Sequence, residues 1–136
     1  GGGCVVQAHP FRDRDYISGI HLNPIYTDGI EAANAGNTSE NDTQAMRWAR
    51  KNGLYTTAGS DIHSAAQYED AELMGIRFPQ KLHTVQDFVE AIRSRSEHSL
   101  QVPEGRFDAL LTKPRKTVWE HGKTTRRVRD TGELFE

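Results

Sequence analysis

The chain has 136 residues, 35% hydrophobic and 26% charged, which suits one folded domain and excludes disorder by composition. Its formal charge of −2 is unevenly distributed, because residues 113–129 hold seven Lys/Arg and one acid and the remainder is acidic. No run reaches the ~18 consecutive apolar residues of a membrane span, no signal peptide is visible, and the single cysteine excludes an internal disulfide, so we expect a cytoplasmic protein.

Residues 4–8 form a short apolar run that predicts a buried strand. The strand should end at His9-Pro10, because proline cannot donate to a sheet ladder. His9 is therefore expected at the carboxyl end of a strand, and Arg12 follows three residues later. Residues 15–22 predict a short helix that ends before Pro24. The chain opens on three glycines without Met, so we expect it to be a piece of a longer protein.

Residues 29–34 predict a second strand, and Glu31 lies within it. A buried carboxylate needs a partner, so Glu31 is a site residue, holds a site ligand in place by a hydrogen bond, or faces water. A helix is then expected from Ser39 or Asn41 to the residue before Gly53. Its apolar positions are spaced for one buried face: Ala45, Met46, Trp48 and Ala49.

Residues 54–58 predict a third strand, which runs into Gly59-Ser60-Asp61-Ile62-His63. Residues two apart in extended chain face the same side, so Asp61 and His63 are expected to point at one spot beyond the strand. A carboxylate beside an imidazole suits a divalent ion such as zinc, manganese or iron. Alone, the pair also fits a capped turn with His63 in solvent.

The second half begins with a strand expected within residues 73–78. Thr84, with Asp87 three residues later, predicts the start of an amphipathic helix whose apolar stripe is Val85, Phe88, Val89 and Ile92. After the break at 103–105, residues 117–128 predict a β-hairpin around His121-Gly122. Its basic residues suit a phosphate-rich ligand, a solvated surface or a partner contact.

The order of these elements is an α/β alternation, which favours parallel strands. In barrels of this class, catalytic groups gather at the carboxyl ends of the strands. His9, Asp61 and His63 all fall at such ends, and three N/O ligands suit a hydrolytic metal. Arg12 has the planar fork that binds phosphate oxygens, although a surface arginine fits its position too.

Two segments resemble motifs of the PHP (polymerase and histidinol phosphatase) domain superfamily. The segment Gly3-Cys4-Val5-Val6-Gln7-Ala8-His9-Pro10-Phe11-Arg12 resembles its third motif, and Gly59-Ser60-Asp61-Ile62-His63 resembles its fourth. Between them, residues 28–34, Asn41 and Ala45 match the usual strand and helix, so the resemblance covers about residues 2–96. It implies a distorted (β/α)7 TIM-like barrel, bound divalent metal ions (Zn, Mn or Fe) and phosphoester hydrolysis. His9, Asp61 and His63 would be the metal ligands, and Glu31 and Asn34 match a recurring family pattern. We take Glu31 and Asn34 as candidates for residues that support the ligands, and Arg12, three residues after His9, as the candidate substrate-binding residue.

The family's first motif, a His-x-His pair, has no counterpart here, and the remaining histidines lack that spacing: His21, His83, His98 and His121. We therefore expect residues 1–101 to be the C-terminal half of a PHP-like domain and residues 102–136 to be a basic extension. One functional hypothesis is a metal-dependent phosphoesterase. We expect a small-molecule substrate in preference to nucleic acid, and no membrane partner. The other is a non-catalytic half-domain, completed by a partner chain or by self-association.

Overall fold

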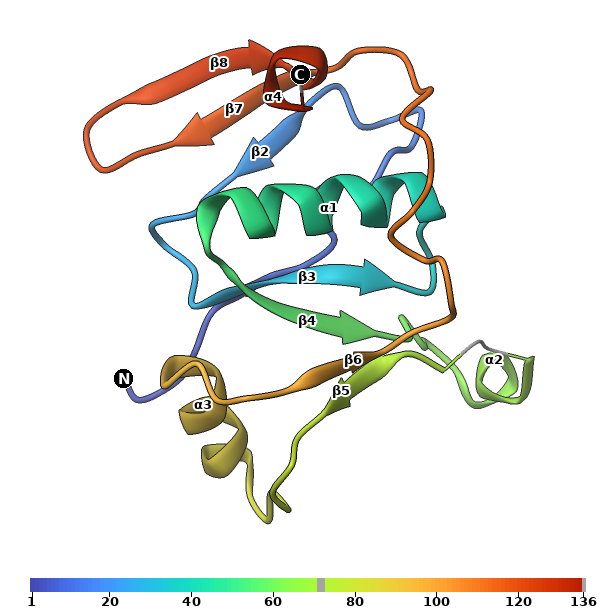
Figure 1. Ribbon diagram of the computed structural model, residues 1–136, viewed down its shortest axis with the longest axis vertical. Helices are drawn as coiled ribbons and strands as arrows, with labels where there is room; N and C mark the ends of the chain where they lie inside the picture. The colour runs from blue at the N-terminus through green and yellow to red at the C-terminus, as the bar shows by residue number, and fades with distance from the viewer. Residues whose placement is uncertain (71–72, 136) are drawn as a thin grey trace.

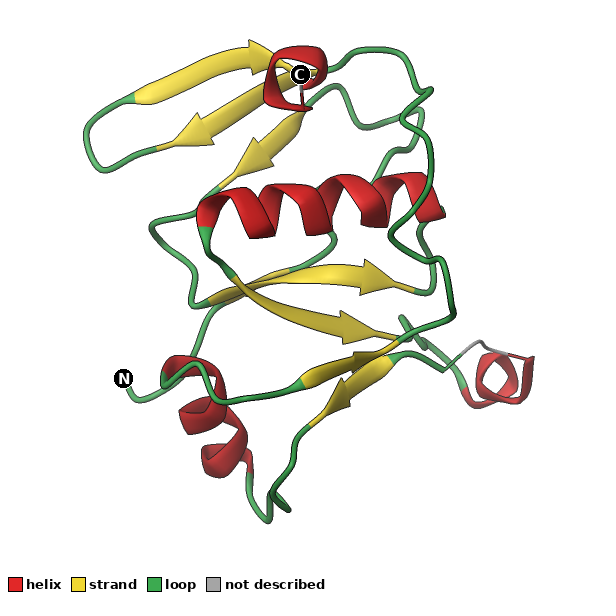
Figure 2. Ribbon diagram, in the orientation of Figure 1, coloured by secondary structure: helices red, strands yellow, loops and turns green. Residues whose placement is uncertain are grey.

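The computed structural model describes residues 1–70 and 73–135 (Figures 1 and 2). In these residues the elements are β1 (Val6–Gln7), β2 (Ile20–Leu22), β3 (Gly29–Asn34), α1 (Ser39–Asn52), β4 (Tyr55–Gly59), α2 (Ala65–Asp70), β5 (Gly75–Arg77), α3 (Val85–Arg93), β6 (Ser99–Gln101), β7 (Thr117–His121), β8 (Arg126–Asp130) and α4 (Thr131–Phe135). The α/β class is confirmed.

Strands β1, β3 and β4 form one parallel sheet with β3 in the middle. The predicted strand at 29–34 is confirmed, and those at 4–8 and 54–58 correspond to the shorter β1 and the slightly shifted β4. The burial predicted for 4–8 is wrong, because β1 is an edge strand and Val5 is 55% exposed. Helix α1 connects β3 to β4, as a crossover between parallel neighbours requires. This connection brings the carboxyl ends of all three strands to the same edge of the sheet.

Helix α1 has the expected ends and the expected buried face. The Thr38 side chain accepts the amide of Asn41 at the start, and Gly53 adopts a left-handed conformation (φ 61°) at the end. Ala45, Met46, Trp48 and Ala49 are all buried, as their spacing predicts. The helix lies between the parallel sheet and a second sheet (Figure 1).

The second sheet has the order β2-β7-β8, with β2 parallel to β7 and β7 antiparallel to β8. The predicted hairpin at 117–128 is confirmed as β7 and β8. The helix predicted at 15–22 is wrong, because residues 20–22 form β2. Ile20 and Leu22 are buried with His21 exposed between them, so pairing with β7 and burial on α1 decide the local conformation.

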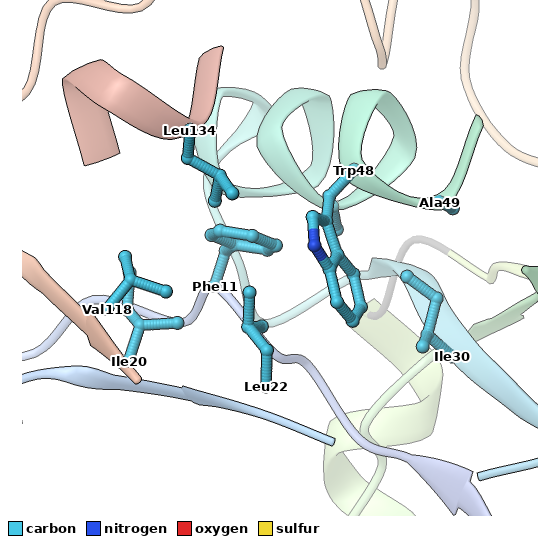
Figure 3. Packing of buried hydrophobic residues seen from close by; sticks show 9 residues of the cluster. Phe11, Ile20, Leu22, Ile30, Trp48, Ala49, Val118 and Leu134 are labelled. Atoms are coloured by element: carbon cyan, nitrogen blue, oxygen red, sulfur yellow. The ribbon is translucent and has the colours of Figure 1, made fainter. Parts of the chain in front are cut away.

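The hydrophobic core lies between α1 and these two sheets (Figure 3). It consists of Phe11, Ile20, Leu22, Ile30, Ala45, Trp48, Ala49, Val118 and Leu134. Phe11 packs edge-on against Trp48, with ring centroids 6.1 Å apart. Val118 and Leu134 come from the C-terminal segment, so residues after 101 complete the same core as residues before it.

The remaining ribbon, β5 with β6, is antiparallel and lies beside β4 (Figure 1). Helix α3 starts with the predicted capping box of Thr84 and Asp87. Val89 and Ile92 of the predicted stripe are buried, whereas Val85 is 80% exposed, because the first turn of α3 projects beyond the sheets.

The sheets formed by residues 1–70 and 73–135 do not close into a barrel. The barrel assignment therefore stays a prediction about a larger assembly. Within the same residues, no helix combines the length and apolar character needed to cross a membrane.

Candidate functional site

The candidate site lies at the edge where β1, β3 and β4 end. His9 follows β1 by two residues, Asn34 is the last residue of β3, and Asp61 follows β4 by two residues. Because these strands are parallel neighbours, their ends deliver polar side chains to one region. This is the placement that the strand order predicts.

Arg12 links the loops that follow the three strands. Its Nε donates to Asn37 Oδ1 at 2.9 Å, and its Nη2 donates to Asn34 Oδ1 at 2.8 Å and to Asp61 Oδ2 at 2.7 Å. The side chain is 16% exposed, so these bonds are partly shielded from water. Nη1 has no hydrogen-bond partner among residues 1–70 and 73–135.

Asp61 and His63 are in contact, with Oδ1 of Asp61 3.1 Å from Nε2 of His63. The hydrogen bond from Arg12 holds the pKa of Asp61 below its ordinary value, although partial burial opposes this shift. The charges of Arg12 and His63 lower the pKa further. His63 is 77% exposed, so the pair opens toward solvent on the imidazole side.

Glu31 joins β3 to the loop after β1. Its Oε2 accepts the backbone N–H of His9 at 2.9 Å and Nδ2 of Asn34 at 3.0 Å. The register between β3 and β4 shifts between Glu31 and Ala33, and such a bulge can re-aim a side chain at a strand end. Glu31 thus holds the His9 backbone, and Asn34 accepts from the Arg12 side chain, while a role for either residue in supporting metal ligands stays a prediction.

The backbone is strained at two of the predicted metal ligands. His9 has φ 26° and Asp61 has φ 54°, values that non-glycine residues adopt rarely. The conformation of His9 is doubly unusual, since the residue before a proline normally stays extended. Such strain of about 1–3 kcal/mol per residue tends to concentrate at functional sites.

Gly36 lies directly against the side chains of Arg12, Asn34 and Asp61. A Cβ there would lie 2.6 Å from Asp61 Oδ2 and 3.1 Å from both Arg12 Nη2 and Asn34 Oδ1. Any larger residue at 36 would therefore displace the ion pair. The glycine lets the loop after β3 approach the side chains directly.

A buried ion pair supports the site from behind, and the sequence did not predict it. Asp42, in the first turn of α1, accepts Arg106 Nε at 2.7 Å, Asn37 Nδ2 at 2.9 Å and the Asn34 backbone N–H at 3.1 Å. Burial raises the pKa of Asp42, and these hydrogen bonds oppose the rise. The only sequence signal for this ion pair was a basic residue, Arg106, just after the break at 103–105.

The structure brings together part of the predicted ligand set. Asp61 contacts His63 and Arg12, whereas His9 joins the network through its backbone N–H. Within the described ranges, no group of three or more His, Cys, Asp or Glu side chains is arranged to hold a metal ion. The three-ligand site stays a prediction.

Comparisons with protein-family models, with curated proteins and with solved structures found no match for this chain. The resemblance to the PHP superfamily therefore still depends on the two motifs and their order.

Proposed function

We propose that the chain contributes the C-terminal part of a metal-dependent phosphoesterase site, in which His9, Asp61 and His63 hold a divalent ion and Arg12 binds the phosphate. The main support is the contact of Asp61 with both His63 and Arg12 at the strand ends. A carboxylate beside an imidazole can hold a metal ion, and a guanidinium bonded to the same carboxylate can bind a phosphate oxygen.

The donor chemistry fits such an ion. Asp61 offers Oδ1 on the side of His63 while its Oδ2 accepts from Arg12, and metal-ligating carboxylates are commonly hydrogen-bonded in this way. When bound, a divalent ion lowers the pKa of water and polarises a phosphoryl oxygen. Glu31 would keep His9 at the site edge through the 2.9 Å bond to its backbone N–H.

Arg12 has a donor available for substrate. Asn34, Asn37 and Asp61 orient the guanidinium plane and leave Nη1 for a phosphate oxygen. Pre-orientation reduces the entropy lost when the anion binds. We propose water as the nucleophile, because among the described residues no Ser or Cys is hydrogen-bonded to a histidine, and Asp61, which contacts His63, is assigned to the metal ion.

Manganese binding tests the proposal, since Mn²⁺ favours carboxylate-containing sites over imidazole alone. Asp61→Asn and His63→Ala should each weaken Mn²⁺ binding by at least about tenfold, measured by electron paramagnetic resonance. His83→Ala is the matched control, because His83 is exposed and its hydrogen bond to Asp87 is made by the backbone N–H, which the substitution keeps. Unchanged Mn²⁺ affinity in both site variants would refute the metal assignment.

Substrate binding is tested separately, with inorganic phosphate as the probe. At saturating Mn²⁺, Arg12→Gln should weaken phosphate binding to the Mn²⁺-loaded protein, and its effect on Mn²⁺ affinity through the lost bond to Asp61 is measured separately. Hydrolysis of a chromogenic phosphomonoester and a phosphodiester should then be assayed with any chain that supplies the missing His-x-His motif. No hydrolysis by that complete, metal-loaded assembly would favour a non-catalytic role.

The second candidate is a structural half-domain, and one observation favours it. The buried groups of the polar network are satisfied by its own members: Arg129 Nε is the only buried side-chain nitrogen or oxygen without a hydrogen-bond partner among the described residues, and it lies outside the site. With Arg12 Nη1 as a donor left over within the described residues, such a network can serve to hold three loops together. Mn²⁺ binding at Asp61 and His63 distinguishes the two candidates.

A further inference from the structure

A histidine pair lies away from the candidate site, on the second sheet. His21 on β2 and His121 on β7 are 100 residues apart in the chain, yet His21 Nδ1 lies 3.1 Å from His121 Nε2. Their ring planes differ by 13°, with centroids 5.4 Å apart. Sequence spacing does not reveal this pair, because it depends on the parallel pairing of β2 with β7.

The sheet holds both rings in place. Ile20 and Leu22 are buried in the core, which directs His21 to the opposite, exposed face. Trp119 is the register partner of His21 and stacks on it, with centroids 4.7 Å apart. A Cβ at Gly19 would lie 2.0 Å from the Trp119 ring, so the indole covers that glycine closely.

We propose that His21 and His121 bind a transition-metal ion, with Cu²⁺ preferred over Ni²⁺ and Zn²⁺, as a two-imidazole clip between β2 and β7. Two nitrogens bound to one ion at about 2.0–2.1 Å, with an angle near 100° between them, lie roughly 3.1 Å apart. The two nitrogens already have this spacing. Imidazole ligands suit copper, nickel and zinc, and the divalent affinity order places Cu²⁺ first.

Without metal, one ring donates an N–H to the unprotonated nitrogen of the other ring. To bind the ion, the donating ring takes its other neutral tautomer, with the proton on its far nitrogen, so the neutral pair releases no proton. Because protons compete with the ion for imidazole nitrogens, the apparent affinity should fall on acidification. The cross-strand neighbour of His121 on β8 is Arg126. Glu120 pairs with Arg129 at 2.6 Å. Water molecules would occupy the coordination positions of the ion that His21 and His121 leave open.

Trp119 provides a local reporter. Cu²⁺ bound to the ring that stacks on Trp119 should quench its fluorescence, whereas Trp48 is 1% exposed and lies in the core. We expect saturable quenching on Cu²⁺ titration of the full chain. Trp119→Phe should remove most of the quenching while Cu²⁺ binding by calorimetry persists.

The decisive variants are His21→Gln and His121→Gln, which keep a hydrogen-bonding side chain of similar size. Each should weaken Cu²⁺ binding by at least about tenfold, and circular dichroism should show the wild-type fold. His83→Ala and His63→Ala are matched controls with one histidine removed elsewhere, and both should retain the Trp119 quenching. The double variant His21→Gln/His121→Gln gives the background from other Cu²⁺ ligands, including the terminal amine.

A second readout is stability, because a ligand that binds only the folded chain raises its melting temperature. Cu²⁺ should raise the unfolding midpoint of the wild type and of the His83→Ala control, and not that of the double variant. Equal Cu²⁺ affinity and equal quenching in the wild type and the folded double variant would overturn the proposal.

Discussion

Replacement of Arg106 by Met is the sharpest test of the interior described above. Arg106 donates to Asp42 Oδ2 at 2.7 Å and, through Nη2, to the backbone oxygens of Asn34 (3.0 Å) and Asn37 (2.8 Å). The two charged side chains are 10% and 1% exposed. The methionine would leave the Asp42 carboxylate buried with two neutral donors, and would leave two carbonyls without this partner.

Breaking a buried pair by removing one partner costs about 3–5 kcal/mol. For a chain of this size the melting temperature should fall by roughly 10–20 °C. Because the pKa of Asp42 is already raised by burial, loss of Arg106 raises it further. A raised folded-state pKa favours the folded state as pH falls through it, so the variant should lose less stability at pH 5.5 than at pH 8.

Urea unfolding of wild type and variant at both pH values measures this effect. The Asp42→Asn/Arg106→Met double variant is the control, since it removes the charge as well as its partner and should recover a substantial part of the loss. A loss below about 1 kcal/mol at pH 8, or an equal loss at both pH values, would refute the reasoning.

Other predictions concern the site edge and the helix start. Gly36→Ala should destabilise the fold and separate Arg12 from Asp61, whereas Gly75→Ala, with nothing within 4 Å of its added Cβ, should not, as two-dimensional NMR can report. Arg12→Gln should raise the pKa of Asp61, as a carboxyl NMR titration can measure. In the wild type, ionised Asp61 stabilises the fold above about pH 3.8, and this stabilisation is lost as the pH falls through the lowered pKa of Asp61. Thr38→Ala should cost about 1 kcal/mol in urea unfolding, because it removes the α1 cap.

Elements with local signals were predictable from sequence. Helix α1 starts at Ser39 and ends before Gly53 as predicted, although the Thr38 cap was not predicted, and the Thr84 and Asp87 capping box marks the start of α3. Asp61 and His63 are in contact as expected, although Asp61 is left-handed (φ 54°) and not extended, so the turn after β4 makes the contact. In each case the partners lie within one element or one loop, where short-range geometry decides.

Features that depend on distant partners were not predictable in the same way. The segment at 20–22 is a strand because it pairs with β7. Its register partner Val118 lies 98 positions after Ile20, so no local pattern reveals the pairing. Asp42 reads as an ordinary acid in the first turn of a helix, and its partner Arg106 is 64 residues away. Arg12 was expected to bind substrate, yet Asn37, a loop residue without a motif, is among the groups that orient it.

The parallel pairing of β2 with β7 has a consequence during synthesis. Val118 is made 98 residues after its register partner Ile20, a delay of about 5–20 s at typical elongation rates of about 5–20 residues per second. Throughout that interval the nascent chain has Ile20 and Leu22 without the strand that covers one edge of β2. A ribosome stall between β4 and β7 would therefore leave these apolar residues accessible to chaperones and proteases, and the core is complete only after the C-terminal hairpin has been made.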